Sequence, residues 1–391
     1  MNRGTIERFE PRSLDAAAAM MREVTLTGMH VAFVGGGTHA DEPAGVEAIL
    51  ATGGMARIVE YAPADQTVTV EAGITLAALA EVLGREGQRL VLEVAEPERA
   101  TIGGAIAANA FGPRRMRYGT LKDLILGVGL VRADGTAARA GGNVVKNVAG
   151  FDLSKLMVGS YGTLALVTSA TLRVHPLAEA TRAFRARAMV PERVWAFVAQ
   201  TRDVRLEPAA LIASRGANGD GYAVDVVLEG FGPGVTAKAD ALFAFAAQGG
   251  WPLAETDPAV AAELDARVRR SGPLRVRCST PSADFAAVDR LAIGPLVRAL
   301  GDGEVVAYPT LGTAFVAGTP SEGDAICSAL ASSRAEAERR GGSLVIEKAG
   351  GDLEAVERWG TPPPSFGLMR QLKHRFDPQG RLSPHAFVGG L

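Results

Sequence analysis

The chain has 391 residues, with 41 basic and 43 acidic side chains and a formal net charge of −2. There is no surplus of cations to bind a phosphate backbone, so nucleic acid is excluded as the main partner. Hydrophobic residues make up 47% of the chain, which excludes global disorder. The two cysteines, Cys278 and Cys327, are too few to hold an iron–sulfur cluster alone. We find no transmembrane segment or secretory signal, and therefore expect a cytoplasmic protein.

Residues 1–177 are expected to form short elements separated by glycines. Helices are predicted over residues 13–26, where Ser13 can cap the helix, and over 75–85, where Thr75 can do so. The apolar and alternating patterns predict strands over 31–34, 57–61, 67–71, 121–132 and 163–174.

Beyond residue 177, longer helices alternate with strands. We expect strands over 183–190, 209–214, 222–229, 274–279, 304–307, 313–317 and 343–348, and helices over 192–203, 235–248, 283–300 and 322–340. This order predicts two successive βαββα units, which is the ferredoxin-like arrangement. The interpretation gives three parts: residues 1–177, an α+β cap over 178–360, and a C-terminal tail over 361–391 that contains a short helix near 369–375.

A glycine-rich loop, Gly35-Gly36-Gly37-Thr38-His39, follows the strand predicted over 31–34. Glycine permits close approach of a pyrophosphate, and successive backbone N–H groups can form an anion site. The spacing of the glycines, with Glu60 about twenty residues further on, also fits the Rossmann dinucleotide fingerprint. However, Pro43 and Gly45 argue against the long helix that a Rossmann loop opens. A plain turn remains the alternative.

Two further segments combine glycines with small or polar residues. The first begins at Thr101-Ile102-Gly103-Gly104 and continues to Tyr118-Gly119. Its small side chains would let the backbone pack against a large flat ligand, and a closely packed helix is the alternative. The second covers 146–153 and 159–164, where polar groups near glycines suit a ligand's hydroxyls and ring edge; the alternative is a helix that stops at glycines.

No convincing catalytic set is present. The five histidines do not have metal-ligand spacing, and there is no nucleophile elbow or P-loop. Arg114, Arg115 and Arg117 stand beside Tyr118, either as a solvated loop or as a site for an anion.

Taken together, the three loops resemble, in order and spacing, the flavin-binding domain of the vanillyl-alcohol-oxidase/p-cresol-methylhydroxylase (PCMH) superfamily over about residues 5–177. The resemblance implies an α+β fold, with a two-subdomain PCMH-type FAD-binding domain followed by the ferredoxin-like cap. It also implies that 35–39 hold the FAD pyrophosphate, that 101–109 lie along the flavin, and that 159–167 add contacts, with one contact altered at Ala165. The cofactor-binding residues implied are Gly35, Gly36, Gly37, Thr38, His39, Pro97, Thr101, Ile102, Gly103, Gly104, Ala108, Asn109, Gly112, Tyr118, Gly159, Thr163, Leu164 and Val167.

The whole chain is similar to the FAD-binding subunits of glycolate oxidases (glycolate dehydrogenases). The matching residues are Gly35–His39, Arg117-Tyr118-Gly119, Val145-Lys146-Asn147, 150–156, Trp359-Gly360, Leu372-Lys373 and Phe376-Asp377-Pro378. The tail departs from the family, because Ser383-Pro384-His385 stands where relatives often have Asn-Pro-Gly-Arg.

This similarity implies an FAD-dependent oxidoreductase acting on CH–OH groups as one subunit of a complex. The expected partners are a catalytic flavoprotein subunit and an iron–sulfur subunit, and the complex would oxidise glycolate or a related small 2-hydroxy acid to the 2-oxo acid. It implies a cytoplasmic chain, with peripheral attachment to the inner face of the cell membrane through the complex left open.

Two features refine the expected role. Some superfamily members attach flavin covalently through a His directly after the loop glycines; here Thr38 has that position, so we expect non-covalent FAD.

The catalytic flavoprotein of such a complex is expected to have a His-rich motif in its cap. Residues 178–391 contain only His374 and His385, both outside the cap, so the cap lacks a base for the substrate's hydroxyl and we expect an accessory subunit. The alternatives are a self-sufficient enzyme that holds a carboxylate with Arg114, Arg117 or Lys146, and a scaffold with a decayed flavin site. Removing 361–391 is expected to weaken assembly or flavin retention more than the fold of residues 5–177.

Overall fold

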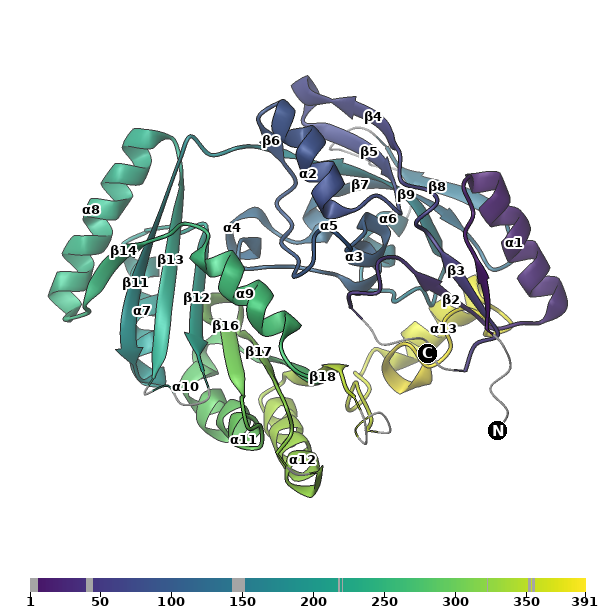
Figure 1. Cartoon of the computed structure of the whole chain (residues 1–391). Helices are drawn as coiled ribbons and strands as arrows, with labels where there is room; N and C mark the ends of the chain where they lie inside the picture. The colour runs from purple at the N-terminus through teal and green to yellow at the C-terminus, as the bar shows by residue number, and fades with distance from the viewer. Residues whose placement is uncertain are drawn as a thin grey trace. The chain divides into compact units, whose positions relative to one another are not determined.

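The computed structural model describes residues 6–39, 45–142, 152–216, 219, 221–321, 323–350, 353 and 356–391 (Figure 1). Its contacts divide the chain into two compact units. Domain 1 comprises Met1–Phe111, Gly119–Leu177 and Thr361–Leu391, and domain 2, the cap, comprises Gly112–Tyr118 and Ala178–Gly360. The sequence interpretation differs from this division in two places: the C-terminal segment belongs with domain 1, and Gly112–Tyr118 belongs with the cap.

The first sheet of domain 1 is parallel, with the order β1-β3-β2. Its strands are β1 (Glu7–Phe9), β3 (Ala48–Ala51) and β2 (Val31–Val34). Helix α1 (Leu14–Thr27) begins at Ser13, whose hydroxyl accepts a hydrogen bond from the Ala16 N–H at 3.2 Å, as predicted. Its apolar residues recur at helical spacing, so that Ala17, Met21 and Val24 enter a core shared with the strands.

The second sheet of domain 1 is antiparallel and has five strands in the order β4-β5-β9-β7-β8. The strands are β4 (Ile58–Ala62), β5 (Thr67–Glu71), β9 (Leu166–Arg173), β7 (Ile125–Val131) and β8 (Ala137–Gly141). The domain also contains α2 (Leu76–Arg85), α3 (Ile102–Ala108), α5 (Leu121–Leu124), α6 (Leu153–Met157) and the short pair β6 (Gln88–Arg89) and β10 (His175–Pro176). The core lies between this sheet and α2 and α3.

The strand predicted over 121–132 begins later than expected. Residues Leu121–Leu124 form a helical turn because Thr120 and Asp123 make a reciprocal cap. The Thr120 hydroxyl accepts from the Lys122 N–H at 3.1 Å, and the Asp123 carboxylate accepts from the Thr120 N–H at 2.7 Å. The apolar run alone did not reveal this cap.

The cap sheet joins two similar halves edge to edge. Its strands are β11 (Ala180–Met189), β12 (Ala210–Arg215), β13 (Tyr222–Gly230), β14 (Leu253–Thr256), β15 (Leu274–Ser279), β16 (Glu304–Tyr308), β17 (Thr313–Gly318) and β18 (Ser343–Lys348), in the order β14-β11-β13-β12-β16-β17-β15-β18. Each half is a βαββαβ unit, and β12 pairs with β16 between them. The ferredoxin-like arrangement is therefore confirmed, with β14 as a strand that the sequence did not indicate.

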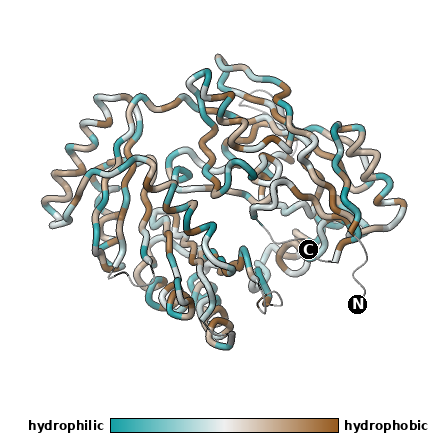
Figure 2. The backbone as a smooth tube through the Cα atoms, in the orientation of Figure 1, coloured by the Kyte–Doolittle hydropathy of each residue, from teal (hydrophilic) through white to brown (hydrophobic). Residues whose placement is uncertain are grey.

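One face of the cap sheet packs on helices α7 (Pro191–Asp203), α8 (Gly232–Gly249), α10 (Phe285–Val288), α11 (Gly294–Arg298) and α12 (Gly323–Arg339). Alternate strand residues, such as Val224, Val226 and Leu228, point into this core. Figure 2 shows that the strands of the cap carry both hydrophobic and hydrophilic residues. The predicted helix over 283–300 is interrupted by a π-helical turn over Asp289–Ile293, because Pro295 has no N–H for the carbonyl of Leu291.

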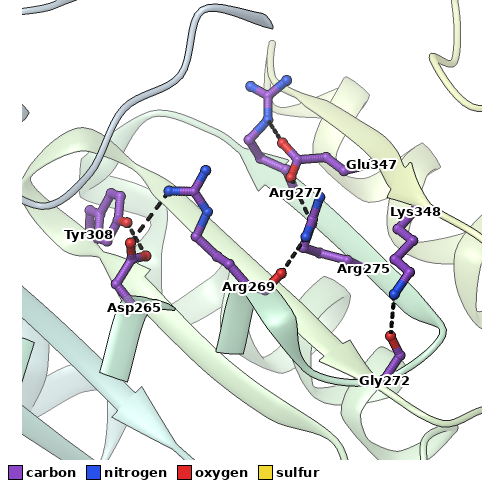
Figure 3. A network of polar contacts seen from close by, with 8 residues as sticks. All are labelled: Asp265, Arg269, Gly272, Arg275, Arg277, Tyr308, Glu347 and Lys348. Atoms are coloured by element: carbon purple, nitrogen blue, oxygen red, sulfur yellow. Dashed lines mark hydrogen bonds and ion pairs between the residues drawn. The ribbon is translucent and has the colours of Figure 1, made fainter. Parts of the chain in front are cut away.

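The opposite face of the cap sheet carries charged residues. Helix α9 (Val260–Arg270), which the sequence did not indicate, packs on this face. Asp265 accepts from the Tyr308 hydroxyl and from Arg269, and Arg275 and Arg277 both donate to Glu347, at 3.1 and 2.8 Å (Figure 3). Burial raises the pKa of Asp265, and the nearby Arg269 opposes this shift. Within the described residues, no helix has both the length and the apolar surface needed to cross a membrane.

Candidate cofactor site

The glycine loop packs against the backbone of residues 99–101. A Cβ on Gly36 would lie 1.7 Å from the Arg99 carbonyl oxygen, and one on Gly35 would lie 2.1 Å from the Thr101 hydroxyl. The Arg99 guanidinium donates to the Gly36 carbonyl at 3.1 Å. Of the three loop glycines, only Gly37 has a left-handed backbone, with φ +64°. The backbone of Arg99 therefore leaves no room for a side chain at position 36, and the close approach of a pyrophosphate to this loop stays a prediction.

The segment Thr101–Asn109 is helix α3 with capped ends, so the alternative of a closely packed helix is correct for its conformation. The Thr101 hydroxyl accepts from the Gly104 N–H at 3.2 Å. Asn109 ends the helix in a left-handed conformation, with φ 50°. Ile102 and Ile106 are fully buried, whereas Gly104, Ala107 and Ala108 are partly exposed. Their spacing places these three small residues on one face, which can accept a flat ligand.

The segment 159–164 lies directly against the end of α3. The Gly159 N–H donates to the Ile106 carbonyl, and the Tyr161 N–H donates to the Ala107 carbonyl, each at 2.9 Å. Both Gly159 and Gly162 have left-handed backbones. The structure thus brings the three predicted segments into one continuous set of contacts: the glycine loop touches the start of α3, and 159–164 touch its end.

An unpartnered buried hydroxyl supports a bound ligand at this set of segments. Ser160 is 5% exposed, and its Oγ has no hydrogen-bond partner among the described residues. A buried hydroxyl normally finds a partner, because burial without one costs free energy. A cofactor with hydroxyl and ring-edge groups would supply that partner, so the residues present fit FAD. Ser160 lies within the predicted segment 159–167 but was not named among the individual cofactor-binding residues.

Several predicted residues have other structural roles. The side chains of Ile102, Leu164 and Val167 are buried in the core of domain 1, so only their backbones can reach a ligand. Pro97 accepts the Ala77 N–H at the start of α2, at 2.9 Å. Thr38 and His39 are partly buried beside the glycine loop. The predicted contacts over 146–151 lie outside the described residues.

Gly112 and Tyr118 belong to a segment that clusters with the cap. There a buried glutamate, Glu229 on β13, holds the segment. The Arg114 Nε donates to Glu229 Oε1 at 2.7 Å, and the Tyr118 hydroxyl donates to Oε2 at 3.3 Å. Arg117 donates to the Glu229 carbonyl at 3.2 Å. Arg114 therefore binds a protein carboxylate, whereas the exposed Arg117 donates to the backbone carbonyls of Glu207 and Glu229. Among the residues that the structure describes, no group of three His, Cys, Asp or Glu side chains is placed to hold a metal ion.

The two-sheet domain 1 with its three predicted cofactor segments, followed by a ferredoxin-like cap, defines a PCMH-type FAD-binding fold. Residues 8–141 match the family model "FAD binding domain". The chain thus carries an FAD-binding domain, and its expected cofactor is confirmed as FAD.

Relatives of known name are similar to this chain over different lengths. It is 40% identical over 129 residues to glycolate oxidase subunit GlcE of Escherichia coli (strain K12), a match covering 33% of this chain and 37% of that protein. The chain therefore spans little more than a third of that relative's length. It is 28% identical to the mitochondrial D-2-hydroxyglutarate dehydrogenase of Bos taurus, over 97% of this chain and 76% of that protein. A solved alkyldihydroxyacetonephosphate synthase superposes with a TM-score of 0.73 at 14% identity, over 96% of this chain and 75% of that one, which shows the shared fold.

Proposed function

We propose that this chain is the FAD-binding subunit of a multi-subunit oxidoreductase that oxidises glycolate or a related small 2-hydroxy acid. In this proposal it is accessory to a catalytic flavoprotein subunit and an iron–sulfur subunit. The FAD-binding domain and the 40% identity to a glycolate oxidase subunit over 129 residues support it. The cofactor-binding residues predicted above are part of the proposal.

One observation favours the accessory role: Arg114, one of the residues named for holding a carboxylate substrate, is already paired with Glu229. Arg114 forms an ion pair with this glutamate, whose side chain is 1% exposed, and Arg117 donates to its carbonyl. A 2-hydroxy acid needs a cation for its carboxylate and a base for its hydroxyl proton. In the segment Gly112–Tyr118, Arg114 instead fixes the segment to Glu229 on a strand of the cap.

The residues of domain 1 have a binding role in this proposal. Bound FAD supplies a two-electron acceptor for oxidation of a hydroxyl-bearing carbon. The glycine loop would hold the pyrophosphate through backbone N–H groups. The exposed face of α3 would support the flavin ring, and the Ser160 hydroxyl would contact a polar group of the cofactor.

Turnover with an artificial electron acceptor tests the proposal. The chain would be assayed alone and after reconstitution with the two partner subunits. We expect the isolated chain to bind FAD and oxidise glycolate negligibly, with activity appearing in the complex. Equal rates would reject the accessory role. Anaerobic mixing with glycolate gives a second measurement, because bleaching of the flavin in the isolated chain would show that it accepts electrons from the substrate directly.

A self-sufficient FAD-dependent 2-hydroxy acid dehydrogenase is the second candidate. The match to D-2-hydroxyglutarate dehydrogenase favours it, because that match covers 97% of this chain, cap included. In this case the isolated chain would turn over a 2-hydroxy acid without partners. The substrate's carboxylate would then be held outside the Arg114–Glu229 pair.

A further inference from the structure

A lysine near the end of α13 (Phe366–Phe376) anchors the C-terminal segment inside domain 1. The Lys373 ammonium donates to the carbonyl oxygens of Thr163, at 2.9 Å, and Leu382, at 2.7 Å, and to the Asp377 carboxylate at 2.7 Å. An ammonium has three protons to donate, so these acceptors satisfy it completely. The side chains of Lys373 and Asp377 are 12% and 0% exposed. Burial lowers the pKa of Lys373, while the hydrogen bond and charge of Asp377 oppose the shift.

Asp377 shapes the turn that leads the chain back to the first sheet. Its carboxylate accepts the N–H groups of Arg381, at 3.0 Å, and Leu382, at 2.8 Å. Leu382 is fully buried and pairs with Val31 in parallel fashion. The Val31 N–H donates to the Arg381 carbonyl at 2.9 Å, and Ser383 donates back to Val31 at 2.7 Å. The C-terminal segment thus adds to the edge of β2, the strand that runs directly into the glycine loop.

The same segment contacts the other cofactor loop. Besides the bond from Lys373 to Thr163, the Phe387 ring stacks on Tyr161, with centroids 5.4 Å apart and planes 22° apart. Gly162 lies so close to Ser383 that a Cβ on it would be 2.9 Å from the serine hydroxyl. Residues 373–387, which we name the C-terminal clasp, therefore contact both the strand before the glycine loop and the segment 159–164.

We propose that the clasp sets the spacing between these two cofactor loops and that Lys373 is a positioning residue for FAD. The loops are attached to different sheets, and in this site FAD must contact both. A ligand that joins two elements binds more tightly when their spacing is already correct, because less ordering is needed on binding. The inference rests on the FAD-binding domain and on the proposed contacts of the two loops. It also gives the motif Leu372-Lys373…Phe376-Asp377-Pro378 a role at loops that lie far from it in sequence.

Substitution of Lys373 by Met tests the clasp, because Met retains the length of the apolar stem and removes the three donors. We expect the Kd for FAD, measured by quenching of flavin fluorescence on the apoprotein, to rise at least about tenfold. The visible circular dichroism of the bound flavin should also change at saturating FAD. Arg85→Met is the matched control, since it removes an exposed ion pair of i,i+4 spacing with Glu81 in the same domain. It should leave both measurements unchanged.

A second control separates positioning from general destabilisation. Leu83→Ala opens a cavity in the core at α2, at a residue that belongs to neither loop, and lowers Tm. A Lys373→Met variant with wild-type Kd and circular dichroism would overturn the clasp. So would equal weakening of FAD binding by Leu83→Ala at a similar loss of Tm.

A milder variant covers the case in which Lys373→Met does not fold. Phe387→Ala removes the stack on Tyr161 and should raise the Kd about threefold. Phe231→Ala, at an exposed cap phenylalanine, should not. Unchanged Kd in Phe387→Ala would contradict the proposal. Failure of the wild-type chain to bind FAD would instead overturn the cofactor assignment, and the clasp's role with it.

Discussion

Replacing Gly36 by alanine should weaken FAD binding because the added Cβ clashes with the backbone of Arg99. The new Cβ would stand 1.7 Å from the Arg99 carbonyl oxygen and 2.5 Å from its carbon. Ordinary contact begins at 3.4 Å, so the loop must retreat by about 1.7 Å from a backbone that cannot rotate aside. Overpacking of this kind costs about 1–3 kcal/mol. If the displaced loop must return for FAD to bind, the Kd rises about 5- to 150-fold.

The assay compares three variants by FAD titration of the apoprotein and by thermal unfolding. Because the clash occurs at Cβ, Gly36→Ala should have most of the effect of Gly36→Val. Gly84→Ala is the control: it lies in α2 of the same domain, nothing lies within 4 Å of the added Cβ, and helix propensity favours Ala. A Gly36→Ala protein that binds FAD with wild-type Kd would refute the packing argument. Tight binding by Gly36→Val would further remove the assignment of this loop to the cofactor.

Three other predictions concern the flavin linkage, the cap and the thiols. Acid precipitation should release all flavin into the supernatant, because Thr38 follows the loop glycines; yellow colour in the pellet would contradict this. Glu229→Gln should lower the free energy of unfolding by about 3 kcal/mol in urea titrations, whereas Glu255→Gln, at an exposed pair, should lower it by under about 1 kcal/mol. At pH 8 a thiol reagent should react rapidly with exposed Cys327 alone, since burial raises the pKa of Cys278 to about 12; two rapid equivalents would show that Cys278 is accessible.

The fold followed from the sequence where local signals agree with packing. The strands Val31–Val34, Thr67–Glu71, Leu274–Ser279 and Ser343–Lys348 occupy the predicted residues. Their apolar or alternating patterns marked them as strands, although Thr67–Glu71 is buried at all five positions. Helix α9 was missed because its buried positions include Asp265 and Arg269, which read as solvent-exposed charges in the sequence. Only the structure shows that they are paired with each other and with Tyr308.

The sequence indicated the three segments of the candidate site, but it did not indicate the C-terminal residues that pack against them. Glycines and small residues marked the three loops, since few other side chains fit such close contacts. The dependence of β2 on Leu382 was not visible, because a single leucine in a tail gives no periodic signal. Leu382 is buried in the domain 1 core, so the C-terminal segment also contributes to the fold of that domain. Removing residues 361–391 should therefore destabilise domain 1 as well as weaken assembly or flavin retention.

The pairing of Arg114 with Glu229 argues against one route by which a self-sufficient enzyme could hold its substrate. If Arg114 turned to hold a carboxylate substrate, Glu229 would lose its cation while its side chain is 1% exposed. Leaving one member of a buried pair uncompensated costs about 3–5 kcal/mol. That cost is similar to the whole binding free energy of a millimolar ligand, about 4 kcal/mol. The cost of leaving Glu229 unpaired would therefore nearly cancel the free energy gained when Arg114 binds the substrate. The same pair is well suited to a structural role, because it fixes residues 112–118, which follow α3 closely in the chain, to a strand of the cap.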